Sequence, residues 1–288
     1  MRVTVFGASG LLGRALISEW ASGPQTPGAD RDQVVGLSSR DADIRDASQV
    51  RAAIQRSNPD WIILAAAYTD VDGCEGDPER AFAVNRNGAV NVAQAAGAAG
   101  AKLLWLSSDY VFDGTKNSPY EIGDRRNPQS IYGRSKAEAE EQLLETLPSV
   151  CVVRTSWLFG MGGKCFPDTI LKLAASRSNL QVVNDQRGCP TYTPDLARAI
   201  IGLCRKDAGG IVHVTNQGDC TWYEFARAII AGAGVSTAVA PCTTEQMPRP
   251  AKRPAYSVLS PDSLDAYGIV MPPWQDALAR YLKQRLAV

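Results

Sequence analysis

The chain has 288 residues, the length of one large α/β unit or of two modest domains that share an interface. Thirty Lys and Arg side chains balance thirty Asp and Glu side chains, so no excess of positive charge points to a nucleic-acid partner or an anionic membrane surface. The chain contains a single histidine, His213, which excludes a histidine-rich zinc site. Any Ser-His or Cys-His pairing would depend on that one residue, so we expect proton chemistry from another residue type.

Seven cysteines are spread along the chain without a Cys-x-x-Cys pair. This pattern argues against a disulfide framework or a zinc ribbon, and buried thiols in a reducing compartment fit it better. The N-terminus runs directly into a strand-like stretch without the apolar core of a signal peptide, and apolar runs such as Trp61–Ala67 are too short to cross a bilayer. We therefore expect a cytoplasmic protein with no membrane partner and no metal centre.

Short β-branched runs alternate with Ala-rich amphipathic stretches over the first 155 residues. This alternation predicts βαβ units and a parallel sheet covered by helices on both faces, which is a Rossmann-type, doubly wound α/β fold. We expect strands over Arg2–Phe6, Gln33–Leu37, Trp61–Leu64, Lys102–Leu106 and Cys151–Arg154, and helices over Leu11–Trp20, Ala47–Ser57, Pro78–Ala99 and Ile131–Leu147.

Beyond Arg154 the pattern is looser, which predicts a smaller C-terminal substrate domain interleaved with the last strands of the sheet. Thr221 and Glu224 are spaced as a capping box at the start of a helix. We divide the chain into a dinucleotide-binding domain over residues 1–160, to which strands near 187–215 return, and a mainly substrate-binding domain over residues 161–288. The expected elements are helices over Asp168–Ser176, Asp195–Arg205, Trp222–Ala231 and Gln275–Leu286, a loop over Gly188–Pro194 and an extended surface segment over Pro241–Pro254.

Three glycines lie between the first predicted strand and the first predicted helix, in the segment Gly7-Ala-Ser-Gly10-Leu-Leu-Gly13. Gly7 permits a tight turn, Gly10 lets the backbone approach a pyrophosphate, and Gly13 lets the helix pack on the strand. The free N–H groups at the helix N-terminus then bind the phosphate charge. The spacing is GxxGxxG rather than GxGxxG, so a plain glycine-rich turn is the alternative. The position between strand and helix favours dinucleotide binding.

The end of the second predicted strand distinguishes NAD from NADP. An acidic side chain there hydrogen-bonds the ribose 2′-hydroxyl of NAD, whereas a basic one accommodates the 2′-phosphate of NADP. Gln33–Leu37 is followed by Ser38-Ser39-Arg40, with no acidic residue at the tip. Arg40 has the forked geometry that pairs with a phosphate, although a solvated loop arginine would give the same pattern. The sequence favours NADP(H), and NAD(H) stays open as the alternative.

Tyr132 and Lys136 lie at the start of a predicted helix in the segment Tyr132-Gly-Arg-Ser-Lys136. The i, i+4 spacing puts both side chains on one helix face. A free tyrosine has a pKa of about 10, and a nearby ammonium group lowers it, so we expect Lys136 to lower the pKa of Tyr132 and to suit it to proton transfer. By itself this pair is typical of many amphipathic helices. The glycine loop upstream favours a catalytic role for the pair over an ordinary helix.

Ser108 lies near the end of the fourth long strand, in the segment Leu103–Phe112. The carboxyl ends of parallel strands meet at the cofactor crevice, so its hydroxyl is placed to donate to a substrate carbonyl as charge develops there. A strand-end serine bonded to its own backbone is the alternative. With Tyr132, Lys136 and the glycine loop, Ser108 indicates carbonyl reduction or alcohol oxidation by hydride transfer.

Longer segments carry a resemblance that covers nearly the whole chain. The sequence resembles the extended short-chain dehydrogenases/reductases and, among them, the dTDP-4-dehydrorhamnose reductase family. Ser107–Gly114 and Arg154–Trp157 are much more specific than the Tyr-Lys pair. The other matching segments are Gly7–Gly13, Pro59–Asp72, Ala83–Asn85, Tyr132–Lys136, Gly188–Thr191, Gly210–His213, Thr221–Ala226 and Arg253–Leu259.

The resemblance implies reduction of the 4-keto group of dTDP-4-dehydro-L-rhamnose to dTDP-L-rhamnose with NADPH or NADH, a step of nucleotide-sugar biosynthesis. It implies that Tyr132 is the proton donor, that Lys136 modulates it and binds the ribose, and that Ser108 stands where the family more often has threonine. The implied contacts are Gly10, Leu11 and Leu12 to the pyrophosphate, Asp43 and Ile44 to the adenine, Ala67, Tyr68 and Thr69 beside the nicotinamide, and Ser108, Asp109 and Trp157 to the sugar nucleotide.

Several alternatives stay open at this point. Core packing is the other interpretation of Trp157, and His213 is expected to be a buried core histidine. Pro248–Pro254 is either a diphosphate contact or a solvated loop. Similar sequences include nucleotide-sugar epimerases and dehydratases, and the regulatory subunit of methionine adenosyltransferase, a cofactor-binding partner; the intact catalytic set favours an enzyme. Members of the family differ in oligomeric state, so a homodimer is one expected assembly.

Overall fold

The computed structural model of the chain describes residues 1–22 and 32–287, and a six-stranded sheet forms its centre. The strand order is β10-β5-β4-β3-β1-β2, and every neighbouring pair is parallel. The chain proceeds from β1 to one edge and then returns to build the other, so the crevice of this doubly wound sheet lies between β1 and β3. The strands are β1 Arg2–Phe6, β2 Gln33–Leu37, β3 Trp61–Leu64, β4 Lys102–Ser108, β5 Cys151–Thr155 and β10 Gly210–His213.

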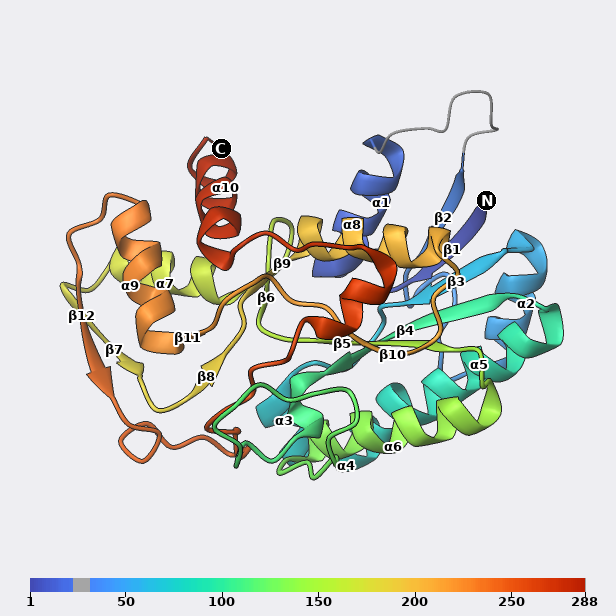
Figure 1. The fold of residues 1–288 in the computed structure, drawn as a ribbon, viewed down its shortest axis with the longest axis horizontal. Helices are drawn as coiled ribbons and strands as arrows, with labels where there is room; N and C mark the ends of the chain where they lie inside the picture. Colours follow the sequence, from blue (N-terminus) through green and yellow to red (C-terminus); the bar gives the residue numbers. More distant parts are fainter. Residues whose placement is uncertain (23–31, 288) are drawn as a thin grey trace.

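Helices cover both faces of this sheet (Figure 1). On one face α1 (Leu11–Ser22) packs against α8 (Thr193–Arg205). On the other face lie α2 (Ala47–Ser57), α5 (Gly88–Ala99) and α6 (Ile131–Thr146). Each layer of helices forms its own apolar core with the strands. Central strands are therefore buried on both sides, which explains why β3 is a continuous apolar run rather than an alternating one.

The predicted Rossmann-type sheet is confirmed, and one predicted helix is wrong. Pro78–Ala99 is not a single α-helix but α4 (Pro78–Phe82), the π-helical turn η1 (Ala83–Asn87) and α5. In the π turn the Gly88 N–H bonds to the carbonyl of Ala83, five residues earlier, which widens the helix. The wider turn holds Asn85 inward, where it is buried. Apolar periodicity does not reveal such a turn, because the flanking helices keep their pattern.

The C-terminal part packs around a second core, beside the sheet in Figure 1. The expected loop over Gly188–Pro194 is wrong, because its ends form short strands and α8 already begins at Thr193. The expected capping box is confirmed, since Thr221 and Glu224 bond each other's backbone N–H groups. The elements are α7 Phe166–Ala174, α9 Trp222–Gly232 and α10 Trp274–Leu286, with the parallel ribbons β7 Asn179–Val183 with β12 Ala238–Cys242 and β6 Leu158–Phe159 with β9 Thr191–Tyr192, and the antiparallel ribbon β8 Arg187–Gly188 with β11 Cys220–Thr221.

The chain passes between the two parts more than once. After α7 and the first ribbon strands, α8 and β10 return to the sheet, and the short helix η3 (Asp262–Tyr267) packs beside β10. The ribbons and α9 and α10 then complete the second part (Figure 1). No helix within residues 1–22 and 32–287 combines the length and apolarity needed to cross a membrane.

Candidate active site

The glycine loop after β1 makes a tight backbone cradle at the N-terminus of α1. Gly7 has a φ of +90°, and a Cβ on it would lie 2.5 Å from the backbone nitrogen of Ala66. A Cβ on Gly13 would lie 2.1 Å from the carbonyl oxygen of Gly7. Only glycine fits at these two positions. The close turn leaves the first N–H groups of α1 at the edge of the crevice, where they suit a phosphate group.

One cavity lies between this loop and the segments that follow β2 and β3. It brings together many residues that the sequence assigned to the cofactor, and its lining includes Gly7, Gly10, Ser38, Asp43, Ile44, Ala67 and Tyr68. Polar groups from the β2 end and apolar side chains from the segment after it share the lining, which matches the mixed surface of an adenosine group.

The arginine of this cavity is not the one that the sequence singled out. Arg40 is exposed and does not line the cavity, whereas Arg45 does. The Arg45 guanidinium donates to both carboxylate oxygens of Asp43, with Nε–Oδ1 and Nη2–Oδ2 distances of 3.0 and 2.6 Å. The turn over residues 39–41 carries Arg40 away from the cavity lining. Counting residues from a strand end does not reveal where such a turn directs each side chain.

A second cavity contains the predicted catalytic residues. Ser108, Tyr132 and Lys136 all line it, although they come from β4 and α6. Gly7, Gly10 and Ala67 line both cavities, so the two adjoin along the glycine loop. The remaining predicted residues that line the second cavity are Leu11, Leu12, Gly13, Thr69, Asp109 and Trp157, and the sequence had not singled out Tyr110, Lys164 or Trp222, which also line it.

The α6 helix places Tyr132, Lys136 and Glu140 on one buried face, one turn apart. Burial raises the pKa of the Tyr132 hydroxyl well above its usual value; the neighbouring Ser108 hydroxyl opposes this shift, and the Asp109 carboxylate adds to it. Burial also lowers the pKa of Lys136 to about 7, against the opposite effect of Glu140. A phenol with a raised pKa keeps its proton at neutral pH, which is the state that a proton donor needs.

The expected lowering of the Tyr132 pKa by Lys136 is contradicted. The Lys136 ammonium donates instead to the carbonyl oxygen of Leu106 at 2.8 Å, and it lies 4.6 Å from the ring centroid of Trp105. Burial is the largest cause of both pKa shifts, because each side chain is almost fully buried, and the Lys136 charge is not among the causes that act on the pKa of Tyr132. The i, i+4 spacing correctly placed the two residues together, but it gave no information on how deeply both are buried.

Ser108 and Asp109 form a polar end of the same cavity. The Ser108 hydroxyl donates to Asp109 Oδ1 at 3.0 Å and accepts the N–H of Tyr110 at 3.2 Å, so it caps the short helix η2 (Asp109–Val111). Asp109 is only 2% exposed, and its Oδ2 atom has no hydrogen-bond partner within the described residues. Burial raises the pKa of this carboxyl to about 6. A buried acceptor without a partner is costly, so it suits a ligand hydroxyl.

Asn85 is a further candidate for the site, which the sequence indicated only as the end of the segment Ala83–Asn85. Its amide exchanges hydrogen bonds with both backbone groups of Tyr68, at 2.8 and 3.0 Å, and its Nδ2 also donates to Ser135 Oγ at 3.0 Å. Asn85 thus ties the segment after β3 to the helix that carries Tyr132. A polar side chain within an Ala-rich helical stretch was the available signal.

Below the cavity, buried charges fix α6 to the sheet. Glu140 accepts from Arg154 on β5 at 2.7 and 2.9 Å and from Ser107 on β4 at 2.5 Å. His213 Nε2 lies 3.3 Å from Arg154, and burial with the arginine charge lowers the histidine pKa to about 3. His213 is thus a neutral core residue, as expected. The network gives Tyr132 and Lys136 a rigid base.

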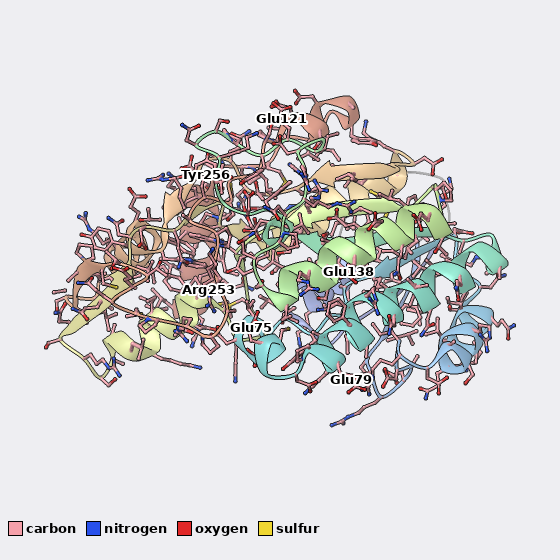
Figure 2. The ribbon with its side chains drawn as sticks, turned by 90° about the horizontal axis from the view of Figure 1, so that it is seen from below. Glu75, Glu79, Glu121, Glu138, Arg253 and Tyr256 are labelled. Atoms are coloured by element: carbon pink, nitrogen blue, oxygen red, sulfur yellow. The ribbon has the colours of Figure 1, made fainter. Side chains whose placement is uncertain are left out.

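The segment over residues 248–254 bonds to the helix that follows the predicted nicotinamide segment. Arg253 donates to both carboxylate oxygens of Asp72, each at 3.0 Å, and the Ala251 N–H donates to the same carboxylate at 3.2 Å. Asp72 belongs to α3 (Val71–Gly76), which directly follows the predicted nicotinamide segment. Arg253 and Glu75, another residue of this helix, are both labelled in Figure 2. The expectation of a solvated loop therefore does not hold for Arg253.

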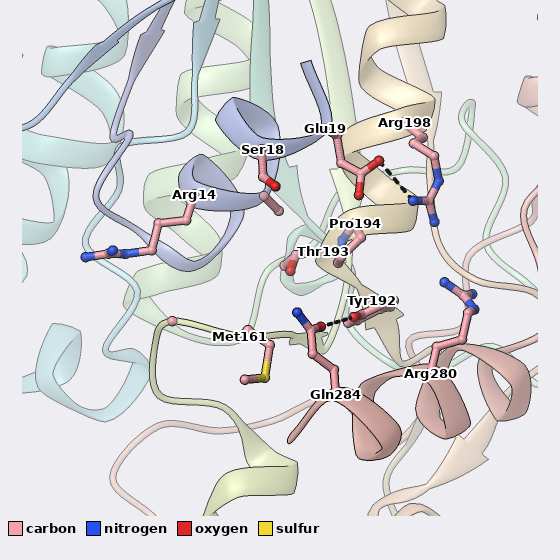
Figure 3. A pocket seen from close by; sticks show the side chains of 12 residues that line it. Arg14, Ser18, Glu19, Met161, Tyr192, Thr193, Pro194, Arg198, Arg280 and Gln284 are labelled. Carbon is pink, nitrogen blue, oxygen red and sulfur yellow. Dashed lines mark hydrogen bonds and ion pairs between the residues drawn. The ribbon is translucent and has the colours of Figure 1, made fainter. Parts of the chain in front are cut away.

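A third cavity lies away from these residues, between α1, α8 and α10 (Figure 3). Two of its arginines are in ion pairs, since Arg198 bonds Glu19 at 3.0 Å and Arg280 bonds Asp195 at 2.7 and 2.9 Å, and Arg14 donates to the Ser9 carbonyl at 3.0 Å. Tyr192 donates to Gln284 at 3.0 Å. None of the predicted site residues lines it. Within residues 1–22 and 32–287, no cluster of His, Cys, Asp and Glu has an arrangement that could hold a metal ion.

Comparison with known proteins gives a match along the whole chain. The profile of the family described as RmlD substrate binding domain matches residues 1–287. The Bacillus subtilis spore coat polysaccharide biosynthesis protein SpsK is 40% identical over 99% of this chain and 98% of its own length. A dTDP-4-dehydrorhamnose reductase of Mycolicibacterium smegmatis is 39% identical over 96% and 84%, respectively. The Bacillus anthracis dTDP-4-dehydrorhamnose reductase, solved in complex with NADP, superposes with a TM-score of 0.93 at 37% identity, covering 98% of this chain and 99% of that chain.

Proposed function

Since the chain belongs to the RmlD substrate-binding-domain family, as its dTDP-4-dehydrorhamnose reductase relatives indicate, we propose that it reduces dTDP-4-dehydro-L-rhamnose to dTDP-L-rhamnose with NADPH. One observation carries the proposal: Ser108, Tyr132 and Lys136 line a single cavity with the glycine loop and Trp157. This arrangement places a proton donor, Tyr132, and a hydroxyl that can bind the substrate oxygen, Ser108, beside the glycine loop. Carbonyl reduction by a dinucleotide needs these groups.

The two adjoining cavities suit a dinucleotide in an extended conformation. NADPH, when bound, supplies the hydride. We assign its diphosphate to Gly10, Leu11 and Leu12, which line the cavity. The glycines on either side, Gly7 and Gly13, keep this backbone cradle open, because a Cβ on either would clash with neighbouring backbone atoms. Its adenosine half is assigned to Ser38, Asp43 and Ile44, with Arg45 rather than Arg40 available for a 2′-phosphate, and its nicotinamide half to Ala67, Tyr68, Thr69 and Lys136.

Tyr132 acts as the proton donor in this mechanism. Its raised pKa keeps the hydroxyl protonated until the substrate oxygen becomes basic, when the proton moves to that oxygen. Ser108 donates a hydrogen bond to the same oxygen, where negative charge develops. Lys136, fixed by its bond to the Leu106 carbonyl, would hold the ribose of the cofactor. Reduction at carbon 4 and proton transfer to its oxygen together convert the ketone to an alcohol.

The sugar nucleotide is assigned to the side of the cavity between Asp109 and Trp157. Asp109 Oδ2 offers an acceptor for a sugar hydroxyl, because it has no other partner within the described residues. Trp157 belongs to the wall formed by the C-terminal part, together with Trp222 and Lys164. Residues 161–288 therefore contribute Lys164 and Trp222 to the substrate side, whereas Asp109 and Trp157 come from residues 1–160.

The direct test mixes the purified chain with dTDP-4-dehydro-L-rhamnose and follows the loss of reduced-nicotinamide absorbance, with NADPH and NADH compared. We expect turnover that prefers NADPH and gives dTDP-L-rhamnose as the product identified by nuclear magnetic resonance. The Tyr132→Phe variant controls for a contaminating reductase. Intact NADPH binding without turnover would overturn the proposal.

Two alternatives give different outcomes in the same assay. A related sugar-nucleotide enzyme would turn over another dTDP-4-keto-6-deoxy sugar in preference, so a panel of such sugars extends the test. A regulatory NADP-binding subunit, like that of methionine adenosyltransferase, would bind NADPH and reduce none of them. The retained Ser108, Tyr132 and Lys136 set supports the enzyme, because a binding module has no use for a buried proton donor.

We also propose a cytoplasmic location and a homodimer as the assembly to test first. All seven cysteines are buried and unpaired, which is the usual state of thiols in a reducing compartment. Sedimentation velocity over a range of concentrations distinguishes a monomer from a dimer.

A further inference from the structure

Two tryptophans form a stacked pair on the wall of the cavity that contains Tyr132. Trp157 follows β5, and Trp222 is the first residue of α9. Their ring centroids lie 3.5 Å apart, with an angle of 7° between the ring planes. Both side chains are half-buried, and both line the cavity with Ser108 and Lys136. Only Trp157 was expected to contact the sugar nucleotide, so the stack leaves Trp222 without an assigned role.

The backbone of Trp157 adopts a conformation that needs support. Its φ is +47°, in the left-handed region that bulky side chains rarely occupy. Such strain persists only where the surroundings fix it, and it concentrates at functional sites. Here the Trp157 carbonyl accepts the N–H of Thr191 at 3.2 Å, and the preceding Ser156 hydroxyl donates to the Cys189 carbonyl at 2.7 Å. The chain therefore holds Trp157 in a single orientation.

One antiparallel ribbon supplies two neighbours of the Trp157 indole. In this ribbon Gly188 of β8 pairs with Cys220 of β11, and Trp222 follows β11 directly. A Cβ on Gly188 would lie 2.6 Å from the Trp157 ring, so the glycine is needed for the indole to fit. Strand β8 thus leaves space for the indole at Gly188, and the end of β11 places Trp222 where it stacks on the indole.

Contacts outside the cavity fix Trp222 in turn. Its ring centroid lies 4.5 Å from that of Phe166 on α7, at an angle of 53°. The capping box of Thr221 and Glu224 fixes the start of α9 at this residue. Trp222 therefore has its own support, and its place does not depend on Trp157 alone.

We propose that Trp222 is a positioning residue for substrate recognition: it stacks on Trp157 and, with Gly188, holds that indole as a fixed wall for the sugar ring of the nucleotide sugar. The inference rests on the proposed function, because it assumes that this cavity takes a sugar nucleotide. The C–H groups and the methyl group of a 6-deoxy sugar give it an apolar side that suits an aromatic wall. A wall fixed in advance lowers the entropy lost when the sugar binds.

The first test replaces Trp222 and measures substrate and cofactor separately. We expect Trp222→Leu to raise the KM for the sugar nucleotide about tenfold, the size of one aromatic contact, while the Kd for NADPH stays unchanged. Trp222→Phe retains a ring and should restore most of the affinity. Tyr223→Leu is the matched control, because Tyr223 is the next residue, is also half-buried and lines none of the described cavities. It should leave KM unchanged.

A double-mutant cycle with Trp157→Leu separates positioning from a direct contact. If Trp222 acts through Trp157, then Trp222→Leu adds little to the KM of the Trp157→Leu variant, so the two effects are not additive. Gly188→Ala provides a variant that leaves Trp222 in place, and it should raise KM by displacing the indole. This second route stays informative if Trp222→Leu lowers the melting temperature too far.

Three outcomes would overturn the inference. They are an unchanged KM in folded Trp222→Leu, additive effects in the cycle, or an unchanged KM in Gly188→Ala. Calorimetric binding of dTDP-L-rhamnose in the presence of NADP repeats the measurement without turnover. A wild-type chain that binds this ligand but reduces no sugar nucleotide contradicts the proposed function alone, whereas unaltered ligand binding in all the variants contradicts the role of Trp222 alone.

Discussion

The sheet and the C-terminal part of this molecule bring their functional side chains together in different ways. In the sheet part, Tyr132 and Lys136 lie one turn apart on α6, and Ser108 ends the strand against which that helix packs. In the C-terminal part, the Trp157 wall depends on a loop, the β8–β11 ribbon and the start of α9. In the proposed mechanism, proton transfer therefore depends on residues held one helical turn apart beside a strand, and substrate recognition depends on a surface assembled from distant segments. Changes in the first part should affect kcat and folding, and those in the second should affect KM.

The largest expected effect comes from removing the proposed proton donor of the sheet part. Tyr132→Phe removes the hydroxyl proton and keeps the ring, so kcat should fall by about 10²–10⁴-fold while the Kd for NADPH stays unchanged. Steady-state rates and cofactor fluorescence titration give the two values. An unchanged kcat would mean that another group donates the proton, and it would remove the main distinction between the two parts.

The next effect tests whether the sheet part is the rigid frame. Glu140→Gln keeps the shape of the side chain but leaves the Arg154 charge buried without its partner, so the free energy of unfolding should fall by about 3 kcal/mol. Glu138→Gln on the same helix is the control (Figure 2), because its pair with Arg86 is partly solvent-exposed, unlike the buried Glu140 pair, and surface pairs contribute about 0–1 kcal/mol. Urea denaturation measures both. Equal losses would show that burial does not set the strength of this network.

A smaller effect is expected at the contact that joins the two parts. Arg253→Leu removes both hydrogen bonds to Asp72, which should lower the free energy of unfolding by about 1.5 kcal/mol, as for a bond to a charged group. The KM for the sugar nucleotide should rise, since Arg253 holds α3, whose first residue Val71 lines the cavity. Arg249→Leu is the control, because Arg249 is 58% exposed and lies 3.6 Å from the same carboxylate. A lower kcat with an unchanged KM would contradict the division of labour between the parts.

The smallest effect is a pH dependence that arises where the two parts meet. Burial raises the pKa of Asp109 from 3.8 to about 6, so the folded chain binds this proton more tightly than the unfolded chain. The contribution of Asp109 to stability is therefore fully present below about pH 4 and is lost as the pH rises to about 6. Comparing the free energy of unfolding of wild type and Asp109→Asn at several pH values isolates the part of the pH dependence that comes from Asp109. Parallel curves for the two proteins would show that Asp109 titrates normally.

The sheet could be predicted almost residue by residue, because its signals are local. Buried parallel strands appear as continuous apolar runs, and β1, β2 and β3 begin and end where expected. The prediction of one helix over Pro78–Ala99 failed for a non-local reason, since the π turn around Asn85 is held by bonds to Tyr68 and Ser135 rather than by its own sequence. The short ribbons of the C-terminal part are two residues per strand in two of three cases, too short for any alternation to mark them.

The sequence alone determined the fold class, the place of the glycine loop and the pairing of Tyr132 with Lys136, since helix and strand periods fix which side chains share a face. The tertiary structure decided that Arg45 rather than Arg40 lines the cavity between the glycine loop and the segment after β2, and that Lys136 bonds the Leu106 carbonyl. It also decided that Trp222 supports Trp157. Each of these depends on burial and on the direction of a turn or loop, which arise only when distant segments pack together.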